Sequence, residues 1–143
     1  MGVLWGIAVV ALSLLCWGGQ VISWFAPAIA VRLTLMESED TVEPSYFADV
    51  RGEALWDTLS LWTMPVAGAL LIAGNSSWVY FGLVGGGMYV YFAGRGIVTR
   101  RAMQQRGYRV GAAQNVKVGY LFLSVWGVMG LITVAAAVVA LSA

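Results

Sequence analysis

Four long apolar stretches run along the chain, and short polar or charged segments separate them. A helix needs about 20 apolar residues to cross the hydrocarbon core of a bilayer. The pattern therefore predicts an all-α, polytopic membrane protein with a four-transmembrane-helix bundle, in a single domain over residues 1–143. The four spans are expected at about 3–31, 55–74, 77–95 and 117–141.

Several residues inside these stretches carry more specific predictions. Pro27 is expected to bend or end the first helix, and Pro65 is expected to kink the second. Gly82 and Gly86 form a GxxxG pair, which predicts close helix packing. Gln20 is a candidate for an intramembrane polar contact, either with another helix or with a ligand.

Composition supports the membrane class and narrows the chemistry. The chain is 60% hydrophobic and only 10% charged, whereas a soluble domain has about 25% charged residues. Histidine, the commonest general base and metal ligand, is absent. Cys16 is the single cysteine, so the chain cannot form an internal disulfide. We therefore expect no cofactor, no metal site and no catalytic residue. Whether the protein is an enzyme stays open, and the composition favours that it is not.

Charges are segregated along the chain, and this pattern predicts the topology. Residues 32–57 hold all seven acidic residues, and residues 95–117 hold six of the eight basic ones. With four spans, the segments 32–57 and 95–117, which contain the expected loops 32–54 and 96–116, share one side of the membrane and hold every basic residue. The positive-inside rule makes that side cytoplasmic and places both termini on the non-cytoplasmic side. We expect a multi-pass protein of a bacterial inner (cytoplasmic) membrane.

Three acidic residues stand at helical spacing just before the second stretch. If a helix begins at Pro44, then Asp49, Glu53 and Asp57 lie at i, i+4 and i+8 and form one ridge. We consider three interpretations of these acidic residues: a solvated surface, pairing with the basic loop, or metal binding. For the pairing, our hypothesis is that one of these carboxylates contacts Arg95, Arg100 or Arg101.

The basic segment is the candidate site for anions. Arginines at a cytoplasmic interface attract the anionic headgroups of lipids. The expected partners are the lipid bilayer, anionic lipid headgroups and further protein chains in a homo- or hetero-oligomer, with no nucleic acid. The candidate anion- or headgroup-binding residues are Arg95, Arg100, Arg101, Arg106 and Arg109.

Two short stretches, EALWDTLSLWTMP at 53–65 and FAGR at 92–95, carry a family resemblance. Together with the size, the four spans and the longer first cytoplasmic loop, they resemble the MAPEG family of membrane-associated eicosanoid and glutathione enzymes. The resemblance implies a trimeric four-helix bundle. Glu53, Asp57 and Ser60 stand at the spacing of that family's arginine–asparagine–glutamate motif, with other residue types, so no catalytic residue is carried across.

Three classes of function fit these features. The first is a non-catalytic helix-bundle subunit or accessory protein of a membrane complex, which packs through its glycine and alanine faces. The second is a small oligomeric transporter or channel, and the third is a MAPEG-like lipid- or glutathione-related enzyme. A polar path for the second class has only modest candidates: Gln20, Ser23, Ser60, Thr63 and Ser124.

Overall fold

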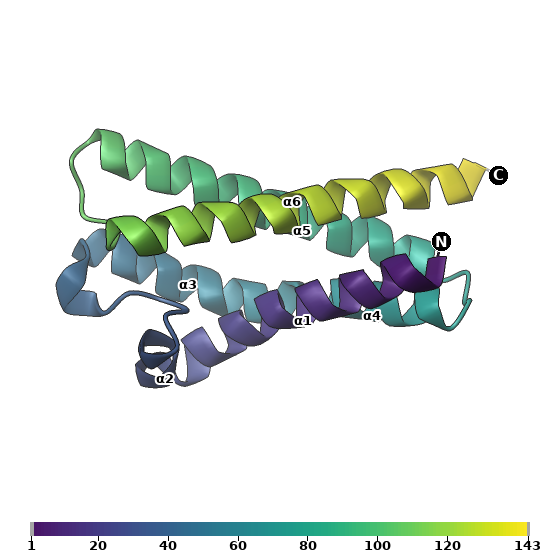
Figure 1. Cartoon of the computed structure of the whole chain (residues 1–143), viewed down its shortest axis with the longest axis horizontal. Coiled ribbons are helices and arrows are strands. Elements are labelled where there is room, and N and C mark those ends of the chain that lie inside the picture. Colours follow the sequence, from purple (N-terminus) through teal and green to yellow (C-terminus); the bar gives the residue numbers. More distant parts are fainter. Residues whose placement is uncertain (1, 143) are drawn as a thin grey trace.

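The fold is entirely helical in a computed structural model that describes residues 2–142, with no strand among them. The all-α class predicted from the sequence is therefore confirmed. The elements are α1 (Gly2–Phe25), α2 (Pro27–Arg32), the short 3₁₀ helix η1 (Glu39–Thr41), α3 (Pro44–Ser60), α4 (Thr63–Ile72), α5 (Trp78–Gln105) and α6 (Ala113–Ser142). Figure 1 shows four rods along one axis, α1, α3 with α4, α5 and α6, with both chain ends at the same end of the bundle.

Three helical segments are long and apolar enough to cross a membrane: Gly2–Phe25, Pro44–Ile72 and Ala113–Ser142. They indicate a membrane protein. The α5 helix has 28 residues, but its glycines, its tyrosines and its basic end make it less apolar than the other three. It also continues past residue 95 to Gln105, so the segment predicted as a loop at 96–116 begins as helix.

Proline explains both interruptions of the long helices. The α1 helix ends at Phe25, and Pro27 begins the separate helix α2, where its fixed φ suits a first turn. The α3 helix ends at Ser60, and Pro65 lies in the first turns of α4. Because proline has no N–H to donate to the Leu61 carbonyl, that carbonyl accepts from the Met64 N–H instead, at 3.2 Å.

Glycines set the closest helix contacts in the bundle. A Cβ atom added at Gly6 of α1 would lie 3.0 Å from the Gly68 carbonyl oxygen of α4. A Cβ atom added at Gly68 would likewise lie 3.0 Å from the Gly6 carbonyl oxygen. A Cβ at Gly86 of α5 would lie 2.8 Å from the Gly130 carbonyl oxygen of α6. Real Cβ atoms almost never come as close as the 2.8 Å contact at Gly86, so a larger residue there requires the backbones to shift, and the 3.0 Å contacts at Gly6 and Gly68 are tighter than ordinary packing.

The two predicted packing glycines differ in how tightly α6 covers them. A Cβ at Gly82 would meet the Thr133 methyl group at 3.3 Å, a distance that small shifts can relieve. A Cβ at Gly86 would meet both the Gly130 backbone and the Val134 side chain, at 2.8 and 2.7 Å. The tighter of the two contacts is therefore at Gly86.

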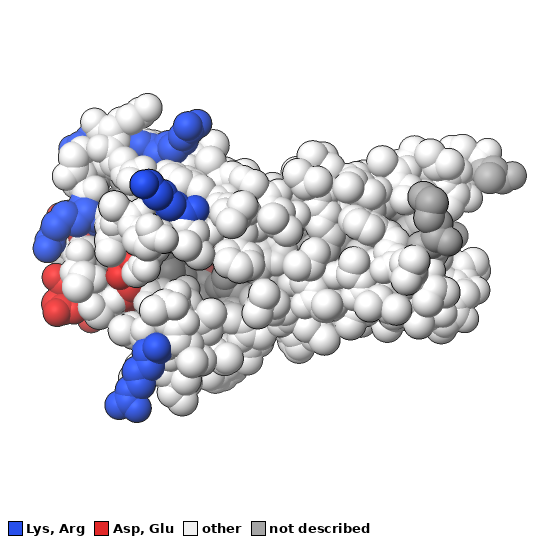
Figure 2. Space-filling view, viewed as in Figure 1, with Lys and Arg blue, Asp and Glu red and all other residues white. Residues whose placement is uncertain are grey.

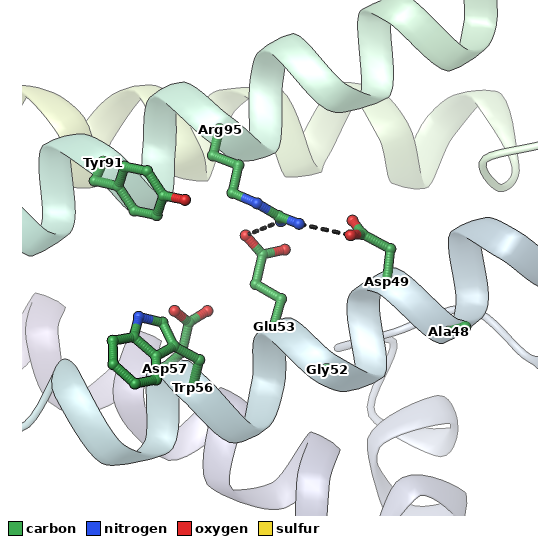
Figure 3. A pocket seen from close by; sticks show the side chains of 8 residues that line it. All are labelled: Ala48, Asp49, Gly52, Glu53, Trp56, Asp57, Tyr91 and Arg95. Carbon is green, nitrogen blue, oxygen red and sulfur yellow. Dashed lines mark hydrogen bonds and ion pairs between the residues drawn. The ribbon is translucent and has the colours of Figure 1, made fainter.

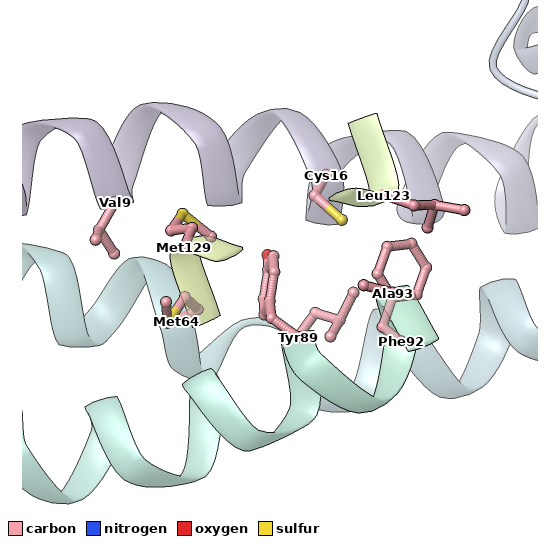
Figure 4. Close-up of a cluster of buried hydrophobic side chains, with 9 residues drawn as sticks. Val9, Cys16, Met64, Tyr89, Phe92, Ala93, Leu123 and Met129 are labelled. Carbon is pink, nitrogen blue, oxygen red and sulfur yellow. The ribbon is translucent and has the colours of Figure 1, made fainter. Parts of the chain in front are cut away.

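A hydrophobic core joins all four rods at mid-length (Figure 4). Tyr89 of α5 lies fully buried there, and its hydroxyl donates to the Ser13 carbonyl of α1 at 3.0 Å. Trp126 of α6 donates from its indole nitrogen to the Leu12 carbonyl at 2.9 Å. These two bonds hold α1 against α5 and α6. The core side chains are Val9, Cys16, Leu61, Met64, Tyr89, Phe92, Ala93, Leu123 and Met129.

A second, smaller cluster packs the two charged connections against each other. Val42 and Tyr46, at the start of α3, contact Val110 and Val116, at the start of α6. The Glu43 N–H also donates to the Arg109 carbonyl at 2.8 Å. We call this set (Val42, Tyr46, Val110 and Val116) the connection cluster.

Charged side chains gather at one end of the molecule, as Figure 2 shows. We call this half the charged end; it holds residues 32–57 and 95–117. The opposite half, the uncharged end, holds the start of α1, the 73–77 turn and the end of α6, and no charged side chain among the described residues.

Candidate functional site

An ion-pair cluster connects α3 to α5 at the charged end. Arg95 donates from Nη2 to Asp49 Oδ1 at 2.6 Å, and its Nη1 lies 2.6 Å from Glu53 Oε1 (Figure 3). The side chains of Arg95 and Asp49 are about one-third exposed, whereas that of Glu53 is 14% exposed. One guanidinium thus bridges two carboxylates one helical turn apart.

The third member of the acidic ridge, Asp57, has no such partner. The residue is 4% exposed, and its Oδ2 has no hydrogen-bond partner among the described residues. Figure 3 shows its carboxylate directed from α3 toward α5, on the same side of the helix as Glu53. A buried carboxylate oxygen without a partner is costly, so Asp57 is a poorly satisfied polar group at this site.

A cavity of about 390 Å³ lies over these residues, between α3 and α5. It exists because α3 and α5 meet at only a few points, while each packs closely on other helices. We call it the α3–α5 pocket. Its lining combines three carboxylates, one guanidinium and two aromatic rings: Ala48, Asp49, Gly52, Glu53, Trp56, Asp57, Tyr91 and Arg95.

A second cavity, of about 410 Å³, opens between α1 and α6 and reaches the connection cluster. We call it the α1–α6 cavity. Its walls are mainly aliphatic and aromatic, with Phe92, Leu123 and Trp126 at its inner side. Gln20, the predicted intramembrane polar residue, lines it, as does Arg100.

Arg100 is the only arginine or lysine lining this cavity. Its Nη1 donates to the Gly96 carbonyl at 3.2 Å, and its guanidinium carbon lies 5.9 Å from the centre of the Tyr46 ring. The one carboxylate in the lining, Glu37, has other partners. Its Oε1 accepts from the Ala112 N–H at 3.2 Å and from Asn115 Nδ2 at 2.9 Å.

The five predicted anion-binding arginines therefore fall into three environments. Arg95 lies between two carboxylates, and Arg100 lines the α1–α6 cavity. Arg101, Arg106 and Arg109 are exposed around the end of α5. Of the three arginines that we named as pairing candidates, Arg95 is the one that makes ion pairs with the acidic ridge.

Sequence reasoning missed several residues that shape the two sites. Arg51 donates from Nη1 to the carbonyls of Ser23 and Trp24, so it binds the end of α1 where the helix dipole is negative. Trp56 and Tyr91 line the α3–α5 pocket. A signal for Trp56 was present, since it stands three residues after Glu53 and so shares its side of a helix, but nothing in the sequence pointed Tyr91 toward the acidic ridge.

Metal binding was one of three readings of the acidic residues. Among residues 2–142, no group of three or more His, Cys, Asp or Glu side chains is placed to hold a metal ion. No known family model, curated protein or solved structure matches this chain. The resemblance to the MAPEG family thus stays a prediction, and the function has to be argued from the two cavities.

Proposed function

We propose that this protein crosses the membrane four times, with α5 as the fourth span, and that both termini lie outside the cytoplasm. A helix of 28 residues is about 42 Å long, which exceeds a hydrocarbon core of about 30 Å. Because α5 packs between α4 and α6, its less apolar glycine face is covered by protein. The gathering of all basic residues at one end supports a cytoplasmic charged end.

A reporter fused to the C-terminus tests this topology. Alkaline phosphatase, which folds only outside the cytoplasm, is expected to be active there, and green fluorescent protein is expected to be dark when exported by the same route. Fusions placed after Gly107, in the connection between α5 and α6, should give the opposite pair of results. An active phosphatase at Gly107 would contradict the four-span arrangement.

The function that the geometry supports best is binding of an anionic lipid in the α1–α6 cavity. The carrying observation is the placement of the Arg100 guanidinium in a cavity whose walls are otherwise mostly apolar. An acyl chain fits against the aromatic and aliphatic wall, and an anionic headgroup fits beside the cation. The cavity lies in the cytoplasmic half of the proposed span, at the depth where headgroups meet acyl chains.

Charge in and around the cavity favours an anion. Glu37 is engaged by two hydrogen-bond donors, the Ala112 N–H and Asn115, so its charge is partly offset. Arg100 has no carboxylate within ion-pair distance among the described residues. Each basic residue near the membrane surface contributes about 1 kcal/mol to the binding of anionic lipid.

In this proposal the protein is a non-catalytic accessory protein that holds a lipid within a membrane complex. A bound lipid fills the gap between α1 and α6 and so stiffens the bundle at its charged end. Packing surfaces for partner chains remain on the outer faces of the helices. There the exposed Gly87 and the half-buried Gly18 have open space beside an added Cβ, and large apolar side chains are exposed.

Native mass spectrometry of the detergent-purified protein tests lipid binding directly. Phosphatidylglycerol is expected to bind more tightly than phosphatidylcholine with the same acyl chains. Arg100→Gln should weaken phosphatidylglycerol binding about fivefold, the equivalent of 1 kcal/mol. Arg101→Gln is the matched control, because it removes the same charge from the neighbouring, exposed position.

Two results would overturn the proposal. One is equal affinity of the wild-type protein for the two lipids. The other is an equal loss of affinity in Arg100→Gln and Arg101→Gln, since a diffuse surface charge would then explain the binding without the cavity.

A further inference from the structure

We infer that the α3–α5 pocket is a binding site for an organic cation, a molecule with an ammonium group attached to an apolar body. This inference concerns a different cavity from the lipid site and does not depend on it. The pocket has a volume of about 390 Å³, which lies within the range of small-molecule sites, about 300–1,000 Å³.

The charges in the pocket do not balance. Three carboxylates, on Asp49, Glu53 and Asp57, face one guanidinium, that of Arg95. Arg95 is occupied by Asp49 and Glu53, at 2.6 Å from each. The pocket with all groups ionised therefore carries an excess of negative charge, and a cationic ligand would offset it.

The burial of Asp57 and its unpaired oxygen are a second observation, beyond the clustering of three acids. It is 4% exposed, it lines the pocket, and its Oδ2 has no hydrogen-bond partner among the described residues. Its two neighbours on the ridge reach Arg95, while Asp57 lies one turn further along α3 (Figure 3). A ligand ammonium beside Asp57 would give a partner to the one carboxylate of the pocket that pairs with no other described residue.

Aromatic side chains complete the recognition chemistry. Trp56 and Tyr91 line the pocket on either side of Asp57, one from α3 and one from α5 (Figure 3). A cation over the face of an aromatic ring is attracted by its quadrupole, most strongly by tryptophan. Both residues are more than half exposed, at 57% and 59%, so much of each ring surface is open to contact with a ligand.

A metal ion fits this pocket less well than an organic cation does. No group of acidic, histidine or cysteine side chains among residues 2–142 has the placement that a metal needs. The Arg95 guanidinium also occupies the space between Asp49 and Glu53, where a small ion would have to bind. An extended ligand, with its charge at Asp57 and its body against the rings, avoids that guanidinium.

Isothermal titration calorimetry with benzyltrimethylammonium tests the inference, on the full chain in a neutral detergent. Neopentylbenzene is the matched neutral ligand, because it has the same shape with carbon in place of the charged nitrogen. We expect saturable binding of the cation and none of the neutral compound beyond its partition into micelles. Equal heats for the two compounds would overturn the inference.

Two variants locate the site. Asp57→Asn keeps the shape of the side chain and removes its charge, so it should weaken cation binding about tenfold or more. Trp56→Leu should weaken binding about threefold, and it stays informative if Asp57→Asn does not fold, because Trp56 is largely exposed. The matched controls are Asp40→Asn, an exposed acid in η1, and Trp62→Leu, a tryptophan outside the pocket.

Binding that survives unchanged in both pocket variants, or that falls equally in the controls, would overturn the assignment. The source of the ammonium is distinguished by repeating the titration in nanodiscs. Competition by phosphatidylethanolamine, compared with phosphatidylglycerol, identifies a lipid headgroup as the natural cation. Undiminished binding in both nanodiscs identifies a free organic cation.

Discussion

The two ends of the bundle are built on different principles. At the uncharged end, glycines bring helix backbones into direct contact, Gly6 against Gly68 and Gly86 against Gly130. At the charged end, α3 stands away from α5 and α1 stands away from α6, and both cavities lie in the space between them. Long side chains make the connections at this end: Arg95 reaches across the gap from α5 to α3, and Arg51 of α3 binds the end of α1.

This difference divides the molecule into a half in which helix backbones touch and a half that contains the two proposed ligand sites. Backbone contact at glycines leaves no volume for a ligand, and it depends on dispersion and packing, which do not require charge. Polar bridges between separated helices leave room beside them, and they place charged groups where a ligand can meet them. Both proposed ligand sites lie at the charged end for this reason.

The largest expected effect is at the glycine contact between α5 and α6. Gly86→Leu places a large side chain where even a Cβ would lie 2.8 Å from the Gly130 carbonyl oxygen. We expect the free energy of unfolding to fall by about 3 kcal/mol, the upper end of the cost of overpacking. The measurement is the unfolding free energy or thermal midpoint in detergent.

Gly87→Leu is the control for this substitution. It makes the same chemical change one residue further along α5, where nothing lies within 4 Å of an added Cβ. We expect it to change stability by less than about 0.5 kcal/mol. If Gly86→Leu were equally mild, the two ends would not differ in the way that the glycine contacts indicate.

The sequence predicted part of the helix packing at the uncharged end. Its GxxxG pair pointed to close packing on α5, and elsewhere in the chain Pro27 and Pro65 pointed to the two helix interruptions. It did not pair Gly86 with Gly130 or Gly6 with Gly68, because a small-residue pattern gives the face of one helix and not the helix that it meets. The choice of partner depends on how the whole bundle is arranged.

A smaller effect is expected at the Arg95 ion pairs, which connect the two helices across the α3–α5 pocket. Arg95→Gln leaves Asp49 and Glu53 without their cation, and Glu53 is only 14% exposed. We expect a loss of about 2 kcal/mol, below the 3–5 kcal/mol of a fully buried pair, because Arg95 and Asp49 are partly solvated. Arg106→Gln, at an exposed position, should change the stability little.

Exchanging the charges distinguishes a specific pair from a general effect of charge. The double variant Glu53→Arg with Arg95→Glu should be more stable than either single variant, because it restores the contact with opposite polarity. Strictly additive losses would mean that Arg95 and Glu53 are not energetically coupled.

The candidate site was predictable in part. The i, i+4, i+8 spacing placed Asp49, Glu53 and Asp57 on one face, and the charge pattern suggested a contact with Arg95. That Arg95 would reach only the first two carboxylates could not be seen from the sequence, because it depends on how far α3 diverges from α5. The α1–α6 cavity could not be anticipated either, since its lining comes from α1, α3, α5, α6 and the connections between them.

The smallest effect is expected at the connection cluster, where the charged end is closed by ordinary apolar packing. Val110 is 4% exposed among Val42, Tyr46 and Val116. Val110→Ala removes two buried carbon groups, for which area burial gives at most about 1.6 kcal/mol, and we expect the free energy of unfolding to fall by about 1 kcal/mol.

Hydrogen exchange provides a second, local measurement. The Glu43 amide, which donates to the Arg109 carbonyl, is expected to exchange faster in the variant. Val98→Ala, at a position that is 65% exposed, should leave both the stability and that amide unchanged. An unchanged exchange rate of the Glu43 amide in Val110→Ala would mean that the backbone contact, and not the connection cluster, holds the two connections together. The charged end would then be less open than its two cavities suggest.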